Sequence, residues 1–381
     1  MGSAQMIDWL STQNEILLNP RMPEGSKGEL HAALSQLGNL NSHVCFATSG
    51  TSGKLKWVAL SKSAILASAH AVNTHLNSDQ SDIWLNPLPD FHVGGVGIAA
   101  RGYLSQAKVV DCHFPDSKWS PIHFHNQLQQ SKATLTSLVP TQVFDLVSLG
   151  LEAPKSLRAI IVGGGAMSEQ VYFAAVKLGW KLLPSYGLTE CASGVATAEY
   201  GSWNLSPIPF LMPLDHVKLD LDENGYLKIK SNSLLTAYIE KGDEGYVLRD
   251  PKKSGWLTTE DKALFEGLKI ISVSRGEHFV KIGGESVDLL RLEKILEEEK
   301  LALQFKDDMA LTALKDVRLG YRIHLAVASP IGDPVQNLVD SFHKRVHPFE
   351  RVSFIHSVNK IPRSPLNKVL KTELAALFKV S

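Results

Sequence analysis

The chain has 381 residues, of which 44% are hydrophobic and 20% are charged, and its 39 basic residues balance its 39 acidic ones. This length predicts two or three folding units, and the composition is typical of a folded, soluble protein rather than a disordered one. Nucleic acids and anionic membranes usually require a basic excess, so the neutral balance argues against either as a partner.

The cysteines and the N-terminal residues bear on where the protein works. Cys45, Cys112 and Cys191 are odd in number and far apart, which favours reduced thiols over a disulfide framework or a zinc site. Residues 1–6 lack the basic segment that opens a secretory signal, and no apolar run reaches the roughly 18–20 residues of a membrane-spanning helix. We expect a cytoplasmic protein without stable membrane insertion; whether it forms a homodimer is left open.

Between residues 44 and 212, short apolar runs alternate with segments of helical periodicity. The apolar runs predict strands at Val44–Thr48, Trp57–Leu60, Ile83–Leu85, Lys108–Asp111, Thr134–Val139, Arg158–Val162 and Lys181–Pro184. The periodic segments predict helices at Lys62–Leu76, Pro121–Gln130, Thr141–Leu149 and Glu169–Leu178. Such alternation predicts an α/β fold whose mostly parallel sheet is flanked by helices.

The pattern changes twice in the remaining chain. Residues 213–275 show short strands separated by turn residues, which predicts a small antiparallel β unit. After residue 275 we expect a small α+β domain over 276–381, following a large domain over 1–275. Its predicted elements are a helix at Asp288–Lys300 with Asp288 as N-cap, strands at Ala310–Leu314, Arg322–Ala328 and Val352–His356, a helix at Pro334–Val346 and a terminal helix from Leu366.

A loop of small and hydroxyl residues lies between the first two predicted strands. Its members are Thr48, Ser49, Gly50, Thr51, Ser52, Gly53, Lys54, Leu55 and Lys56. Small residues let a backbone approach a ligand closely, and hydroxyl and backbone N–H groups can donate to phosphate oxygens. The glycine spacing is too short for a Walker A loop, and a strand follows instead of a helix. By itself, the segment predicts either a phosphate loop or an ordinary hairpin turn.

The segment Ser185–Glu190, Ser-Tyr-Gly-Leu-Thr-Glu, directly follows a predicted strand. Ligands of open α/β sheets collect at the carboxyl ends of the strands, and a glutamate there can hold Mg²⁺ beside nucleotide phosphates. The alternative is a strand-to-helix turn with a solvated Glu190.

Taken in order, these segments resemble the motifs of the adenylate-forming superfamily, which includes acyl-CoA synthetases, luciferases and the adenylation domains of peptide synthetases. Further segments that match in the expected order are Ile161–Ala166, Gly255–Asp261, Ser274–Glu277, Lys281–Glu285 and Ile361–Lys368. Within the superfamily, Pro87–Gly95, Thr136–Gln142 and Tyr186–Ser193 resemble the o-succinylbenzoate–CoA ligases of menaquinone synthesis.

The resemblance implies a role for each matching residue. Phosphate binding is implied for Thr48, Ser49, Gly50, Thr51, Ser52, Gly53 and Lys56. Adenine or ribose binding is implied for Gly163, Gly164, Gly165, Tyr186, Asp261 and Arg275. Catalysis is implied for Lys368, Thr189, Glu190 and His92, with Glu190 as the ligand of Mg²⁺. An acyl pocket is implied for His92, Pro140, Thr141, Ser185 and Gly187, and the hinge and CoA route for Glu277, Lys281, Gly283 and Gly284.

The family implies an enzyme that uses ATP and Mg²⁺ to adenylate a small aromatic acid and passes the acyl group to coenzyme A. It also implies that the C-terminal domain rotates about the hinge between the two half-reactions. From the residues alone, Lys368 could be a solvated lysine opening the terminal helix, and His92 a packed structural histidine. Other readings are a different acyl-CoA ligase, a domain that loads a carrier protein, and a non-catalytic nucleotide-binding relative.

The chain also departs from the family pattern. The phosphate loop starts at residue 48, whereas family members usually carry well over a hundred residues before it, so much of the N-terminal subdomain is expected to be missing or replaced. Leu55 stands where proline is usual, Trp57 where glycine is, and Asn367 replaces the glycine before the lysine. Because none of these changes removes a charged catalytic group, we expect an active enzyme.

Overall fold

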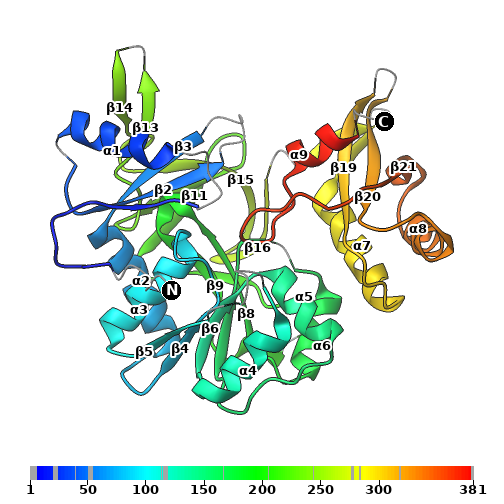
Figure 1. Ribbon diagram of the computed structural model, residues 1–381, viewed down its shortest axis with the longest axis horizontal. Helices are drawn as coiled ribbons and strands as arrows, with labels where there is room; N and C mark the ends of the chain where they lie inside the picture. Colours follow the sequence, from blue (N-terminus) through cyan, green and yellow to red (C-terminus); the bar gives the residue numbers. More distant parts are fainter. Residues whose placement is uncertain are drawn as a thin grey trace. The chain divides into compact units, whose positions relative to one another are not determined.

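The computed structural model describes residues 7–19, 25–38, 40–49, 55–112, 114, 119–165, 167–204, 206–242, 244–275, 279–282, 285–316 and 319–378. The chain forms two compact units, shown together in Figure 1. The first unit contains Met1–Leu138, Glu152–Gly164 and Gly179–Val273. The second contains Val139–Leu151, Gly165–Leu178 and Ser274–Ser381. Among the described residues, no helix has both the length and the apolar character to cross a membrane.

The first unit is built on an eleven-stranded sheet. Its strands, in spatial order, are β11 (Val217–Leu221), β12 (Tyr226–Ser231), β15 (Leu257–Glu266), β16 (Lys269–Arg275), β10 (Leu211–Pro213), β9 (Ser193–Ala198), β8 (Leu182–Leu188), β7 (Ala159–Val162), β6 (Leu135–Leu138), β4 (Ile83–Asn86) and β5 (Lys108–Asp111). Strands β5, β4, β6, β7 and β8 are parallel, as the α/β alternation predicts. From β9 onward, the pairings along the sheet that are resolved run antiparallel.

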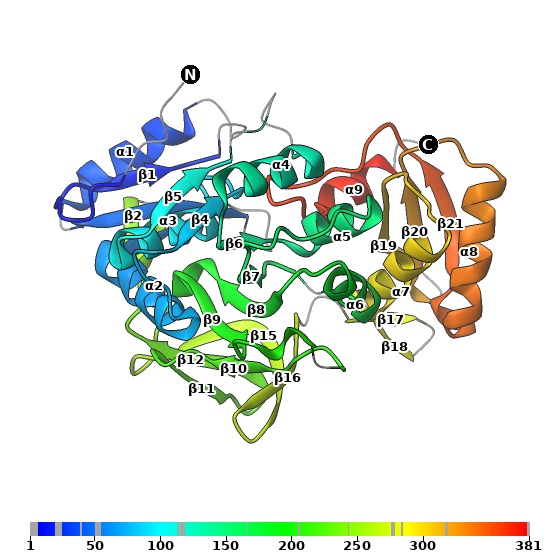
Figure 2. The same ribbon diagram turned by 90° about the horizontal axis from the view of Figure 1, so that it is seen from below.

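Helices cover both faces of the parallel strands. Helices α2 (Lys62–Leu76) and α3 (Val93–Ser105) pack together on one face, and α4 (Pro121–Ser131) lies on the other (Figure 2). This follows from right-handed crossovers, because the chain moves one way from β4 to β5 and back past β4 to β6. Trp84, Leu135 and Leu183 are fully buried in the apolar cluster that these strands share with α2 and α3.

A second, five-stranded sheet corrects two expectations. It contains β1 (Glu15–Leu17), β2 (His43–Ser49), β3 (Leu55–Ser61), β13 (Ala237–Gly242) and β14 (Gly245–Arg249), and α1 (Ser26–Leu37) packs beside it. The first two predicted strands therefore do not join the parallel sheet, because the short connection between β2 and β3 permits only an antiparallel hairpin. The strands after residue 213 are antiparallel as predicted, yet they are shared between the two sheets instead of forming a sheet of their own.

Three helices differ from the expectation, and the first of them, α1, was not predicted. Helix α3 was not predicted because Gly94, Gly95 and Gly97 lower its intrinsic helix propensity. At least one of these glycines is required by packing, since a Cβ at Gly95 would lie 2.3 Å from the Pro89 carbonyl oxygen. The terminal helix α9 begins at Lys371 and ends at Leu377, later than predicted, because the preceding residues form a closed turn.

The C-terminal part of the second unit is an α+β fold, as expected. Its sheet contains β18 (Glu285–Asp288), β17 (Phe279–Ile282), β20 (Gly320–Val327), β19 (Met309–Asp316) and β21 (Val352–Ser357). Helices α7 (Leu289–Ala302) and α8 (Asp333–Arg345) bury Leu292, Leu338 and Phe342 in its core. Asp288 is the N-cap of α7, as predicted, and accepts hydrogen bonds from two backbone N–H groups. Helices α5 (Pro140–Ser148) and α6 (Glu169–Lys177) also belong to this unit.

A partly buried ion pair holds the amino ends of the parallel strands. Arg158, just before β7, donates from Nε and Nη2 to the two carboxylate oxygens of Asp82, just before β4, at 2.8 and 2.6 Å. Arg158 also donates to the Leu76 carbonyl at the end of α2. Burial alone would raise the pKa of Asp82, but hydrogen bonds from Arg158 and Thr134 outweigh it and hold the pKa below its usual value.

We expect Arg158→Met to lower the free energy of unfolding by about 2–4 kcal/mol, because the Asp82 carboxylate stays buried without its partner. The pKa of Asp82 is depressed in the folded state, so this contribution is present at neutral pH and fades as the pH falls below about 4. Urea unfolding of both proteins at several pH values measures it. Arg249→Met, which breaks the more exposed pair with Glu240, should cost no more than about 1 kcal/mol; equal losses in the two variants would contradict the account.

Candidate functional site

The candidate site is at the carboxyl ends of β7 and β8, where ligands of open α/β sheets bind. Gly163 follows β7, and a Cβ there would lie 3.3 Å from the carbonyl oxygen of Ser185, so the two strand ends are closely packed. The hydroxyl of Ser185 forms hydrogen bonds with the Ala196 carbonyl at 3.1 Å and the Thr197 hydroxyl at 2.9 Å. Strand β8 continues past the predicted Pro184 to Leu188 by pairing with β9.

Tyr186 and Asp261, both predicted site residues, are brought together by the sheet. The Tyr186 hydroxyl donates to Oδ2 of Asp261 at 2.7 Å, and Asp261 lies on β15. Burial and the adjacent carboxylate both raise the pKa of Tyr186, so its hydroxyl stays protonated and donates. The hydroxyl of Thr259 accepts a hydrogen bond from the Asp261 N–H at 3.1 Å and fixes the backbone there.

Glu190 lies on a 3₁₀ turn, Thr189–Cys191, directly after β8. Its Oε1 accepts a hydrogen bond from the Tyr238 hydroxyl at 3.0 Å, and its carbonyl accepts one from the Leu235 N–H at 2.7 Å. Tyr238 belongs to β13 of the five-stranded sheet and pairs with Val58 of β3. Glu190 is therefore fixed to both sheets of the first unit. The sequence analysis did not predict Tyr238, because no local pattern announces a pairing between strands so far apart in the chain.

Gly187, in β8, allows this strand to lie close against β9. A Cβ at this position would lie 1.8 Å from the carbonyl oxygen of Ser193, a backbone atom that cannot move aside. Next to the turn, Cys191 is fully buried, and burial raises the pKa of its thiol to about 12. Its sulfur is 3.1 Å from the Ser233 hydroxyl, so Cys191 is a packing residue and not a nucleophile.

The predicted phosphate loop is only partly described. Strands β2 and β3 form a hairpin in which Thr48 pairs with Lys56 and Ser49 with Leu55. Gly50, Thr51, Ser52, Gly53 and Lys54 lie outside the described residues, as do the side chains of Thr48, Ser49 and Lys56. Since Tyr238 is one strand away from β3, the hairpin that carries the loop and the carboxylate of Glu190 are linked through a single strand.

His92 is the N-cap residue of α3, but its side chain does not cap the helix. Its ring lies 5.0 Å from that of Phe91, and its Nε2 is buried without a hydrogen-bond partner among the described residues. Burial lowers the pKa of His92 to about 4, so the imidazole is neutral at physiological pH. A buried ring nitrogen without a partner favours a role toward a ligand over that of a satisfied core histidine.

Arg101, in α3, was not predicted and is a buried cation. It is 3% exposed, its Nη1 donates to the Ser137 hydroxyl at 3.2 Å, and its guanidinium lies 5.3 Å from the centre of the Trp84 ring. No carboxylate pairs with it among the described residues, and burial lowers its pKa to about 10. Burying an unpaired charge is costly, so such a group calls for an anionic partner. An arginine nine positions after His92 was the signal available in the sequence.

Gly164, at the end of a first-unit segment, has a positive φ of 82°, and the other remaining predicted residues belong to the second unit. Pro140 and Thr141 begin α5, and the Thr141 hydroxyl is buried without a partner among the described residues. Gly165 packs against Pro140, since a Cβ there would lie 3.6 Å from the proline ring. The backbone N–H of Lys368 donates to the Ser364 hydroxyl at 3.1 Å. Glu277, Gly283 and Gly284 lie outside the described residues, and the side chains of Arg275 and Lys281 are not described.

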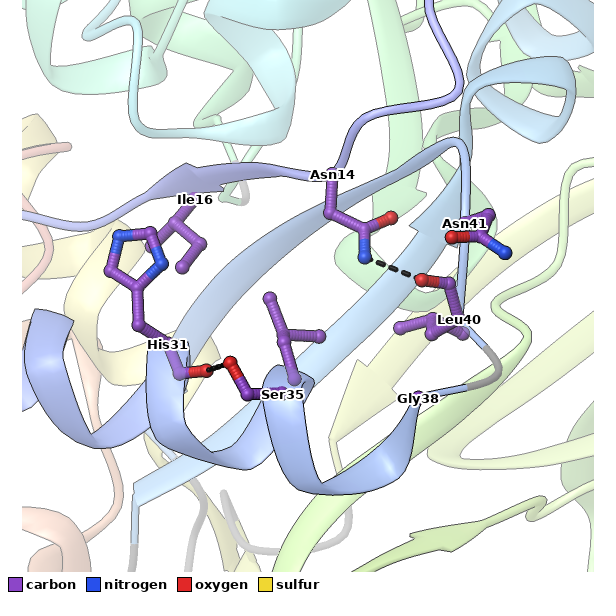
Figure 3. Close-up of a pocket in the computed structure, with 8 residues that line it drawn as sticks. Asn14, Ile16, His31, Ser35, Gly38, Leu40 and Asn41 are labelled. Atoms are coloured by element: carbon purple, nitrogen blue, oxygen red, sulfur yellow. Dashed lines mark hydrogen bonds between the residues drawn. The ribbon is translucent and has the colours of Figure 1, made fainter.

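The single carboxylate of Glu190 suits a magnesium ion that is also bound by phosphates and water. It does not suit a metal ion whose ligands all come from protein side chains. Within the described ranges, no group of three or more His, Cys, Asp or Glu side chains gathers to hold a metal ion. Mg²⁺ commonly takes only one or two protein carboxylates and completes its shell with phosphates and water, which a single fixed carboxylate allows. A separate hollow of about 310 Å³ beside α1 and β1 contains none of the predicted residues (Figure 3). The side-chain amide of Asn14, which lines this hollow, donates a hydrogen bond to the Leu40 carbonyl.

The chain is similar to known proteins in sequence and in fold. The family model described as "AMP-binding enzyme" matches residues 41–238. The chain is 26% identical over 344 residues to a 2-succinylbenzoate–CoA ligase of Bacillus cytotoxicus. The aligned region covers 87% of this chain and 69% of that protein.

Two solved structures of o-succinylbenzoate CoA synthetase from Bacillus subtilis are similar in fold. The complex with the acyl-adenylate intermediate gives a TM-score of 0.72 at 22% identity, covering 87% of this chain and 68% of that one. The complex with ATP and a magnesium ion gives 0.71 at 22% identity, covering 87% and 69%. This likeness confirms the predicted fold class.

We expect Gly187→Ala to lower the free energy of unfolding by at least about 3 kcal/mol, because the added methyl group meets the Ser193 carbonyl and forces β8 and β9 apart. Gly28→Ala is the matched control: it lies in α1 with open space around it, and should raise stability by roughly 0.4–1 kcal/mol. Urea unfolding measures both. A Gly187→Ala protein as stable as the wild type would show that β8 and β9 are less closely packed before Glu190 than described.

Proposed function

This chain belongs to the family of AMP-binding enzymes, and we propose that it activates 2-succinylbenzoate with ATP and transfers the acyl group to coenzyme A. The observation that carries the proposal is that two residues at the carboxyl end of β8 are each held by a hydrogen bond. Tyr186 is bonded to Asp261 of β15, and Glu190 is bonded to Tyr238 of β13. The name of the curated relative supports the choice of acid.

The proposed reaction has two steps at one site. First, a carboxylate oxygen of the acid attacks the α-phosphorus of ATP, and pyrophosphate leaves. The thiol of coenzyme A then attacks the acyl carbon, the bond to AMP breaks and the thiol proton passes to solvent. The first step brings two anions together, so it needs nearby positive charge. The attraction between this charge and the phosphate oxygens must be stronger in the transition state than in the ground state. Bound magnesium would supply part of that charge at Glu190.

The chain's own residues would divide the remaining work. Tyr186 would bind the adenine face, and Asp261 would accept hydrogen bonds from the ribose hydroxyls. Lys368, in the second unit, would donate to the phosphates during adenylation, and a hinge at Glu277 would let the Lys281–Gly284 segment serve the thiol in the second step. The neutral imidazole of His92 would lie against the acyl group.

Arg101 is proposed to select the acid. 2-Succinylbenzoate has two carboxylates, and the one that does not react must be buried when the acid binds, which requires a cation. Arg101 is a buried guanidinium without a carboxylate partner among the described residues, and Ser137, to which it donates, is in β6 of the same parallel sheet. A monocarboxylic acid would leave that charge uncompensated.

The direct test of the function is to incubate the protein with ATP, Mg²⁺, coenzyme A and 2-succinylbenzoate and to detect the acyl-CoA, AMP and pyrophosphate by mass spectrometry. Turnover of other acids but not this one would identify a different acyl-CoA ligase. Adenylate without thioester would indicate a carrier protein as acceptor. If the protein binds ATP but releases no pyrophosphate with any acid of a panel, it is a non-catalytic nucleotide-binding relative.

We expect Arg101→Met to raise the KM for 2-succinylbenzoate by on the order of 10–100-fold, the loss of one charged hydrogen-bonded contact. Activity toward 4-oxo-4-phenylbutanoate, which lacks the ring carboxylate, should change by less than about threefold, because that acid has no group for Arg101 to bind. Pyrophosphate release measures both. Equal losses for the two acids would mean that Arg101 serves the fold alone.

We expect Tyr238→Phe to weaken binding of Mg²⁺–ATP by about 3–10-fold, because Glu190 loses the hydrogen bond that fixes its carboxylate. Titration calorimetry without acid measures this binding free of turnover. Tyr246→Phe, which removes a hydroxyl from the neighbouring strand β14, is the control and should bind as the wild type does. Unchanged binding by Tyr238→Phe would exclude Tyr238 as a support for Glu190.

A further inference from the structure

Lys368 is at the end of a closed turn in the second unit. The Leu370 N–H donates to the Pro362 carbonyl at 2.9 Å and closes the turn at its base. Inside it, the Ser364 N–H donates to the Lys368 carbonyl at 2.7 Å, while the Lys368 N–H donates to the Ser364 hydroxyl at 3.1 Å. The backbone on both sides of the lysine is therefore fixed by one serine.

Arg363 spans this turn from within. Its Nε and Nη2 donate to the two carboxylate oxygens of Asp308 at 2.9 and 2.5 Å, and its Nη1 donates to the Asn367 carbonyl at 2.8 Å. The Arg363 side chain is 19% exposed and that of Asp308 is 39% exposed, so solvent screens this ion pair in part. A guanidinium can serve a carboxylate and a carbonyl together because its donors lie in one rigid plane, whereas a lysine ammonium cannot match that geometry.

The contact with Asn367 falls on the weakest point of the turn. Asn367 has φ of 61°, in the left-handed region that costs most residues energy, and it directly precedes Lys368. Its N–H donates to the Ser364 carbonyl at 2.8 Å, and the bond from Arg363 to its carbonyl is the second contact that holds this conformation. Arg363 therefore opposes the conformational freedom of the residue that aims Lys368.

Asp308 supplies the fixed end of the arrangement. It directly precedes β19, and its carbonyl accepts a hydrogen bond from the Ala328 N–H at 2.8 Å, which ties it to the end of β20. The sheet thus sets the position of Asp308, Asp308 sets the orientation of Arg363, and Arg363 holds the turn.

We propose that Arg363 and Asp308 are positioning residues for adenylate formation, which hold the turn that presents Lys368 without touching the reacting atoms. The inference rests on the proposed function, because it assumes that Lys368 serves the first half-reaction. It predicts a selective defect: the adenylation step depends on the placement of the lysine, whereas thioester formation from a supplied acyl-adenylate does not.

The two half-reactions of Arg363→Met, Arg363→Lys and Asp308→Asn test the proposal. We expect Arg363→Met to slow adenylate formation by on the order of 10–100-fold and thioester formation by less than about threefold. Arg363→Lys should recover part of the lost adenylation rate, since it keeps a positive charge beside Asp308 but loses the hydrogen bond to the Asn367 carbonyl. Arg345→Met is the matched control, because Arg345 pairs with Glu298 and Glu299 in the same unit, and it should leave both rates near the wild-type values.

Hydrogen exchange supplies a readout that does not depend on activity. In Arg363→Met, the hydrogen-bonded amides of the turn should exchange at least about tenfold faster than in the wild type, while those of β19 and β20 keep their rates. These amides are those of Ser364, Asn367, Lys368 and Leu370. Unchanged exchange, equal loss of both half-reactions, or the same defect in Arg345→Met would overturn the proposal. A wild-type protein that forms no acyl-adenylate would instead contradict the proposed function, and the exchange measurement would still decide whether Arg363 holds the turn.

Discussion

The hydrogen bond from Tyr238 to Glu190 joins the two sheets of the first unit at the proposed nucleotide site. One sheet provides Glu190 at the end of β8, and the other provides Tyr238 beside the β2–β3 hairpin that holds the predicted phosphate loop. A metal-binding carboxylate and a phosphate-binding loop must keep a fixed separation, because a nucleotide spans both. A pairing across two sheets fixes that separation better than a loop alone.

Two buried groups of α3 and its N-cap lack a full set of partners among the described residues: one lacks a hydrogen-bond partner and the other lacks a carboxylate. The neutral ring of His92 leaves Nε2 unpaired, and Arg101 holds a charge against Ser137 and Trp84. Both are already desolvated before a ligand arrives, so a ligand that pairs with them loses less free energy to desolvation. The amino ends of the same strands show the opposite arrangement, in which Arg158 and Asp82 satisfy each other. Stability and recognition are thus assigned to opposite ends of one sheet.

Much of the local structure could be predicted from the sequence. Both ends of the predicted helix Lys62–Leu76 agree with those in the structure. Ser61 caps the helix and Asn77 ends it in a left-handed conformation, and both are local signals. Helix α3 was missed because Gly95 is required by its close packing against Pro89, which a propensity scale does not contain. Tyr238 and Arg101 were missed for the same kind of reason: the bond from Tyr238 to Glu190 spans 48 positions, and the burial of Arg101 depends on α3, β4 and β6 together.

The central claim is that Glu190, fixed between the two sheets, meets the phosphates of a nucleotide whose sugar lies at Asp261. The most direct measurement is a crystal structure of the protein with Mg²⁺ and a non-hydrolysable ATP analogue. The account predicts that the metal is bound to Glu190 while the Tyr238 hydroxyl keeps its hydrogen bond, and that a ribose hydroxyl lies within hydrogen-bond distance of Asp261. A nucleotide bound with its phosphates elsewhere, and Glu190 in contact with Tyr238 alone, would contradict it.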